Sequence, residues 1–208
     1  MKKAKDKLDF RKEAFKRIEE MHPHMVLLYV SMIGSGVIFL FTIVAFSVSR
    51  PENLEFLKID FPKSFIVSSF IMLTSSFTIS RVLPAFEKDD LEEVKKWLGV
   101  TLLLGLVFSA AQIIGWRELQ SNNIFFSGHR TGAYLYVISG LHVIHMLGVM
   151  TYLVVLLMEC HKTSKDVVKH LLYATNPYQK TKFKILRDFW HFTDVAWIVL
   201  FFYFLFSF

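Results

Sequence analysis

The chain has 208 residues, of which 53% are hydrophobic, and it carries a formal net charge of +6. Its 24 Lys and Arg and 18 Asp and Glu are strongly segregated, because Asp194 is the only one of them inside five long apolar runs. This segregation excludes a water-soluble globule, a disordered chain and a nucleic-acid-binding domain built around the positive charge.

The apolar runs have the length and pattern of membrane-spanning helices. A helix needs about 20 apolar residues to cross a bilayer, whereas a barrel strand needs about 10 with alternating polarity. No useful length of this sequence alternates with period two. The sequence therefore predicts an all-α membrane protein, a five-transmembrane-helix bundle formed by a single domain over residues 1–208. The spans are expected at about residues 25–49, 64–83, 97–116, 131–158 and 189–208.

The basic residues between the spans predict the orientation. Lys and Arg are concentrated in residues 1–24, 81–96 and 159–188, and few occur in 50–63 and 117–130. By the positive-inside rule, the basic leader of residues 1–24 lies in the cytoplasm and the C-terminus lies at the outer face. The apolar run after the leader is too long for a cleaved signal peptide, so we expect the leader to be retained.

Two short segments outside the spans have helical patterns. Residues 8–21 place apolar side chains at helical spacing among Lys and Arg, as in an interfacial amphipathic helix, and a solvated charged segment is an equal alternative. Ser164 is expected to cap a short helix with Leu171 and Leu172 on its apolar face, which ends at Asn176-Pro177.

Four titratable side chains lie inside the last two spans. His142 and His145 are three residues apart and share a face of the fourth span, and His191 and Asp194 repeat this spacing in the fifth. An HxxH pair facing an HxxD pair offers four ligands for a metal ion or haem in a helix bundle. The competing interpretation is interhelical hydrogen bonding, with Asp194 accepting from a His or Trp N–H. The single Cys160 excludes an internal disulfide.

The second span carries pairs of small hydroxylated residues. Ser68 and Ser69 recur as Ser75 and Ser76 after seven residues. Such a stripe lets helices approach closely and share hydrogen bonds. A permeation path is disfavoured, because transporters often break their helices near the midplane and no Pro interrupts these apolar runs.

Motifs in four of the five spans form an ordered set. Residues 189–197 read FWHFTDVAW, residues 140–145 read GLHVIH, residues 72–78 read MLTSSFT, and residues 101–116 contain Leu104-Gly105, Phe108 and Gln112. In order and spacing they resemble the WHFxDxxW, GxHxxH, TSSxT and T-x-x-LG-x-x-F-x-x-x-Q motifs of subunit III of haem-copper respiratory oxidases, the cytochrome c oxidase subunit III family.

This resemblance implies the five-helix form of the family, without the first two helices of the seven-helix form. It implies an accessory, non-redox subunit of a proton-pumping terminal oxidase in a bacterial inner membrane, where the whole complex passes electrons from cytochrome c to oxygen. The implied partners are subunits I and II, membrane phospholipid and a larger respiratory supercomplex. Haem and copper are expected in the partner subunits, so this chain is expected to have no catalytic, cofactor-binding or metal-binding residue.

The resemblance also implies structural roles for the motif residues. Their four titratable side chains are expected to lock the last two spans together by buried hydrogen bonds. The residues expected to act between helices are His142, His145, Trp190, His191, Asp194, Trp197 and Gln112, and those expected to allow close packing are Ser68, Ser75, Ser76, Gly140 and Gly148.

Three acids that are typical of the family are missing. The SE pair of the family reads Ser31-Met32, the Glu of Q-x-x-E is replaced by Gly115, and Lys184 stands six residues before Trp190 where a Glu is usual. These losses argue against proton relay through the carboxylates and leave packing and lipid holding intact. Two alternatives stay open: a stand-alone metal- or haem-binding membrane protein that uses the His and Asp cluster, and a subunit III-like protein of a quinol oxidase or nitric oxide reductase.

Overall fold

The computed structural model describes residues 23–49, 62–126 and 130–207, so the predicted segment of residues 8–21 lies outside it. The described residues form helices and no strand. Five of the helices are long and apolar enough to cross a membrane, which confirms the predicted five-helix membrane bundle. In chain order the helices are α2 (Pro23–Val48), α3 (Lys63–Glu87), α4 (Leu91–Ser121), α5 (Arg130–Thr163), α6 (Val167–Thr175) and α7 (Pro177–Ser207).

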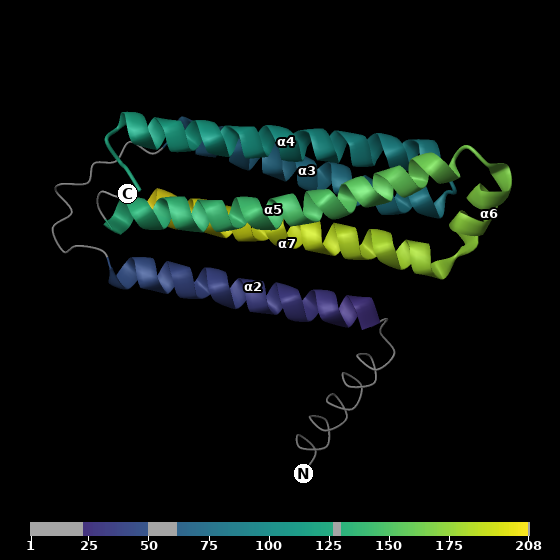
Figure 1. Cartoon of the computed structure of the whole chain (residues 1–208), viewed down its shortest axis with the longest axis horizontal. Coiled ribbons are helices and arrows are strands. Elements are labelled where there is room, and N and C mark those ends of the chain that lie inside the picture. The colour runs from purple at the N-terminus through teal and green to yellow at the C-terminus, as the bar shows by residue number, and fades with distance from the viewer. Residues whose placement is uncertain (1–22, 50–61, 127–129, 208) are drawn as a thin grey trace, which may run out of the picture.

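The five long helices run along one common direction, and the short helix α6 closes one end of the bundle (Figure 1). The start of α2 and the turn between α3 and α4 lie at this α6 end. The starts of α3 and α5 and the end of α7 lie at the opposite end. The start of α2, the α3–α4 turn and the connection from α5 to α7, which the charge pattern places on the cytoplasmic side, therefore lie at the α6 end.

Three of the long helices extend well past their apolar runs at the α6 end. Helix α4 begins at Leu91 and not near residue 97, α5 continues to Thr163, and α7 already begins at Pro177. The extra turn of α4 has its own stabilising contacts, because the Asp90 carboxylate accepts from the Glu93 amide at 2.8 Å. Apolarity thus marks the length within the bilayer, whereas capping and charged turns decide where a helix ends.

Helix α6 forms as predicted, but Ser164 is not its cap. The Asp166 carboxylate accepts from the Lys169 amide at 3.3 Å, and the Ser164 hydroxyl instead accepts from the Lys95 ammonium group at 3.0 Å. Leu171 and Leu172 are 67% and 65% exposed. A short helix with such an apolar surface at the end of a bundle is suited to the membrane interface.

The core lies among α3, α4, α5 and α7, while α2 packs less closely. Helix α3 makes its most extensive contacts with α4 and its next most extensive with α7. Only 17% of the most apolar stretch of α2 is buried, against 33 to 44% for the other spans, and α2 stands apart from the bundle in Figure 1. Large side chains that are fully buried in the core include Phe65, Phe108, Trp190, Trp197 and Phe204.

Candidate functional site: the polar interior of the bundle

Two buried serines of α3 accept hydrogen bonds from the two motif tryptophans of α7. The Trp190 indole Nε1–H donates to Ser75 Oγ, and the Trp197 Nε1–H donates to Ser69 Oγ, both at 3.0 Å. Each serine hydroxyl in turn donates to a carbonyl oxygen of its own helix at 2.8 Å. Each serine thus satisfies an indole that would otherwise be an unpaired donor in a low-dielectric interior.

Helix α3 is hydrogen-bonded to α4 as well. The Gln112 side-chain amide donates to Ser68 Oγ at 2.9 Å, and the hydroxyls of Thr78 and Thr101 lie 2.8 Å apart. All four side chains are buried. Helix α3 is therefore the shared partner of α4 and α7. Sequence reasoning missed the Thr78–Thr101 pair, although both residues stand within the matched motifs.

His191 reaches from α7 to two further hydroxyls of α3. Its Nδ1 lies 2.8 Å from Ser76 Oγ, and its Nε2 lies 3.2 Å from Ser80 Oγ. Ser80 already donates its proton to the Ser76 carbonyl oxygen, so it accepts from His191 Nε2–H. The Ser76 hydroxyl makes the second contact of the ring, at Nδ1.

Asp194, one turn further along α7, is 4% exposed and lies beside this pair. Its Oδ2 is 3.8 Å from His191 Nδ1, which is beyond hydrogen-bond distance. Among the described residues, neither carboxylate oxygen has a hydrogen-bond partner. The tryptophan N–H groups that were candidate donors to Asp194 bond to Ser69 and Ser75 instead.

The two histidines of α5 both lie near the Phe39 ring of α2, but their other contacts differ. His145 Nε2 lies 2.7 Å from Ser35 Oγ of α2, while His145 Nδ1 lies 2.8 Å from the Leu141 carbonyl oxygen. His142 is fully buried, and its ring centroid is 5.1 Å from that of Trp197. Within the described part of the chain, neither ring nitrogen of His142 has a hydrogen-bond partner.

The four titratable side chains are thus not brought together. His145 links α5 to α2 and His191 links α7 to α3, so in the described segments none of the four hydrogen-bonds α5 to α7. Residues three apart on a helix differ by about 60° in direction, which is enough to turn them toward different neighbours. Across residues 23–49, 62–126 and 130–207, no group of three or more His, Cys, Asp or Glu side chains is placed to hold a metal ion.

Gly140 and Gly148, the two glycines expected to allow close packing, have open space around them within the described residues. A Cβ at Gly140 would make one ordinary contact at 3.9 Å, and a Cβ at Gly148 would meet nothing within 4 Å. At Gly115, in contrast, a Cβ would lie 2.2 Å from the buried ring of Phe65. The position where the family carries a Glu is therefore occupied here by an aromatic ring from α3.

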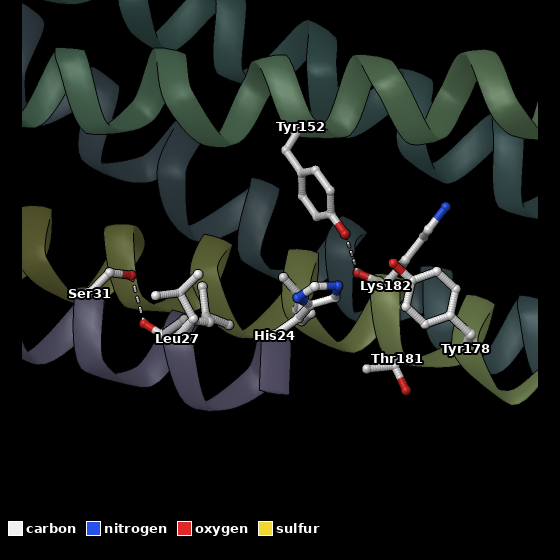
Figure 2. Close-up of a pocket in the computed structure, with 9 residues that line it drawn as sticks. His24, Leu27, Ser31, Tyr152, Tyr178, Thr181 and Lys182 are labelled. Atoms are coloured by element: carbon white, nitrogen blue, oxygen red, sulfur yellow. Dashed lines mark hydrogen bonds between the residues drawn. The ribbon is translucent and has the colours of Figure 1, made fainter. Parts of the chain in front are cut away.

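Figure 2 shows a cavity of about 380 Å³ where the start of α2 meets α5 and α7. Ser31 lines it, beside the position at which the family acid is replaced by Met32. Tyr152 crosses the cavity from α5 and donates to the Lys182 carbonyl oxygen at 3.4 Å. The residues that line this cavity include hydroxyls and the Lys182 stem but no carboxylate.

Comparison with known proteins identifies the family. The family model described as cytochrome c oxidase subunit III matches residues 57–207, which include α3 to α7. "Probable cytochrome c oxidase subunit 3" of Mycobacterium tuberculosis is 28% identical over 133 residues, covering 64% of this chain and 61% of the relative. "Cytochrome c oxidase subunit 3" of Synechocystis sp. is 28% identical over 194 residues, covering 86% of this chain and 75% of the relative.

A third relative carries a different name. "Cytochrome bo(3) ubiquinol oxidase subunit 3" of Buchnera aphidicola is 29% identical over 138 residues, covering 65% of each chain. The chain spans about three fifths of the length of the mycobacterial relative. These bacterial relatives and the five spans together identify a multi-pass bacterial membrane protein. Because the family model matches well over half of its residues, the chain belongs to the cytochrome c oxidase subunit III family.

Proposed function

We propose that the chain is the accessory, non-redox subunit III of a proton-pumping terminal oxidase that transfers electrons from cytochrome c to oxygen. In this role it packs on subunit I beside subunit II, holds phospholipid between its helices, and stabilises the complex during turnover. Its N-terminus lies in the cytoplasm of a bacterial inner membrane. Haem and copper belong to the partner subunits.

The observation that supports this proposal is the set of hydrogen bonds that the buried polar side chains form between helices. In α3, α4 and α7 the motif hydroxyl, indole and amide groups bond to one another across helix interfaces. Such bonds stabilise one arrangement of the helices. A bundle whose motif residues on α3, α4 and α7 are bonded across the helix interfaces is suited to support a catalytic neighbour.

Lipid holding is supported by the loose packing of α2. Besides the cavity in Figure 2, a second cavity of about 230 Å³ lies between α2 and α7 and is lined by Phe39, Leu40, Phe192 and Val199 among others. The first cavity is partly polar and lies at the α6 end, whereas the second is apolar and lies deeper. This change from a partly polar to an apolar cavity matches a phospholipid with its headgroup near the α6 end and its acyl chain along α2.

Affinity purification of the tagged chain from membranes in mild detergent tests the proposal. We expect mass spectrometry to identify oxidase subunits I and II, and we expect haem absorption in the complex but not in the separated chain. A stoichiometric haem or copper signal from the chain alone would refute the non-redox role. Because one relative is named for a ubiquinol oxidase, oxidation of cytochrome c and of quinol should be measured on the same preparation.

A further inference from the structure

Arg81 is exposed on α3, and its charged group points away from the nearer end of the helix. Its Cζ lies 4.6 Å from the ring centroid of Phe77, which is one turn closer to the middle of α3. Helix α3 ends at Glu87, six residues or about 9 Å beyond Arg81. An arginine near a helix end usually extends its stem toward the lipid headgroups, but this guanidinium points back into the apolar part of the span.

The described residues form no ion pair with Arg81. Within the described segments its guanidinium packs over the Phe77 ring. Arg81 directly follows the apolar run of α3, and a charge at this depth usually pairs with another group. Its guanidinium is therefore available to an anion from outside the described part of this chain.

Further polar groups lie exposed beside Arg81. Ser80 is exposed, and the His191 side chain is one third exposed although it lies halfway along α7. Ser80 and His191 are hydrogen-bonded to each other, but exposed polar groups of this kind in a membrane bundle normally face protein. The polar part of this surface is thus poorly matched to lipid.

An apolar cavity continues the same surface toward the opposite end of the bundle. It has a volume of about 410 Å³ and lies between Phe70 and Leu73 of α3 and Ile198 and Phe202 of α7. Phe70, Phe77 and Arg81 are separated by seven and four residues, so they lie along one stripe of α3. Phe70 is 67% exposed.

We propose that this α3–α7 face, formed by Phe70, Phe77, Ser80, Arg81 and His191, is the docking surface for a transmembrane helix of another subunit. That helix places a carboxylate against Arg81 and an apolar side chain in the 410 Å³ cavity. A phospholipid is a poorer match, because its phosphate lies at the bilayer surface from which the guanidinium is turned away. The inference rests on the proposed function, since it takes the partner from the same oxidase complex.

Photo-crosslinking in intact cells tests the surface directly. The photoreactive phenylalanine analogue benzoylphenylalanine replaces Phe77, and, as a control on another exposed face, it replaces Leu106 of α4, which is 53% exposed. We expect ultraviolet light to join the Phe77 variant to a membrane subunit of the oxidase, with a yield far above that of the Leu106 variant. Products with lipid alone at Phe77 would overturn the proposal.

Substitutions of Arg81 provide an independent test of the docking surface. Removing one member of a desolvated charge pair weakens association strongly. We therefore expect the Arg81→Gln variant to co-purify with about one tenth or less of the partner subunit that the unchanged chain retains in mild detergent. Arg81→Lys keeps the positive charge, so this variant should retain most of the partner subunit. Arg117→Gln, at an exposed arginine near the end of α4, should behave as the unchanged chain. Size-exclusion chromatography verifies that each variant stays monodisperse.

The outcomes separate this inference from the proposed function. If the unchanged chain co-purifies with oxidase subunits, but Arg81→Gln retains them equally and Phe77 crosslinks only to lipid, the docking surface is wrong and the accessory role stands. If the unchanged chain brings down no oxidase subunit, the proposed function is wrong and the docking inference falls with it.

Discussion

The buried serines of α3 show how one small side chain can hold two helices. Each hydroxyl of Ser69 and Ser75 gives its proton to its own backbone and keeps its oxygen for an indole of α7. Alanine would keep the close approach and lose the acceptor. Interhelical hydrogen bonds of this kind contribute on average about 0.6 kcal/mol, and up to roughly 1.7 kcal/mol.

Substitution of the Trp197–Ser69 pair should reveal this coupling. We expect Trp197→Phe to lower the free energy of unfolding in detergent by about 1 kcal/mol, because Ser69 loses its donor while most of the ring remains. Ser69→Ala should have little further effect in the Trp197→Phe background. Unfolding curves of both single variants and of the double variant measure the coupling, and strictly additive losses would contradict the bond.

The contact between Gly115 and Phe65 makes a second prediction at the residue scale. Gly115→Ala should destabilise the chain by about 1–3 kcal/mol, because the new Cβ would lie 2.2 Å from a fully buried ring. Gly148→Ala is the matched control, since nothing lies within 4 Å of a Cβ there. Thermal unfolding of both variants measures the difference in stability between them. Phe65→Leu should partly rescue Gly115→Ala, and a lack of rescue would count against this contact as the cause.

The sequence motifs showed which polar residues are important, but they did not show which atoms those residues contact. Trp190, Trp197 and Gln112 were named from their motifs, and the structure places all three in buried hydrogen bonds. Their acceptors follow from the rotation and depth of α3, which no local pattern specifies. The same reason explains why His145 hydrogen-bonds to α2, whereas His142, three residues away, packs against Trp197 of α7.

At the scale of elements, the existence of the helices was predictable and their ends were not. Apolar runs report the bilayer thickness, so they identify five spans. The turns that extend α4, α5 and α7 are rich in charge and look like loops by hydropathy. Contacts between helices stabilise these turns, as where Lys182 pairs with Glu159 at 2.8 Å across the α5–α7 interface.

The tight turn between α3 and α4 predicts that substitutions at two adjacent residues change the stability of the chain in opposite directions. Asp89 has a φ of 59°, in the left-handed region that favours glycine, and Asp90 caps α4. Asp89→Gly should stabilise the chain by up to about 1 kcal/mol, and Asp90→Ala should destabilise it by about 1 kcal/mol. Thermal unfolding measures both changes. Stabilisation by Asp90→Ala would show that the cap is unimportant.

At the scale of the whole molecule, the predicted orientation can be tested through single cysteines. The native Cys160 is fully buried, so an impermeant thiol reagent should find little background. Lys165→Cys lies in the exposed turn before α6 and should be labelled only from the cytoplasmic side. Asn122→Cys, exposed at the opposite end, should be labelled only from outside. The reverse pattern in intact cells and inverted vesicles would show that the orientation is wrong.

The accessory role predicts a time-dependent loss of activity. Oxidase purified without this chain should consume oxygen at first and then lose activity during continued turnover, because the supporting bundle and its lipid are absent. Oxidase purified identically with the chain should hold its rate. Oxygen consumption followed over many turnovers measures the difference, and equal persistence of the two preparations would contradict the stabilising role.

The indole–serine bonds also bear on the order in which the chain enters the membrane. A membrane protein is synthesised from its N-terminus, so α3 is available in the bilayer before α7 leaves the ribosome. Trp190 and Trp197 arrive when the oxygens of Ser75 and Ser69 are already in place. We therefore expect the last helix to find its rotation by pairing these indoles with acceptors that were synthesised more than a hundred residues earlier.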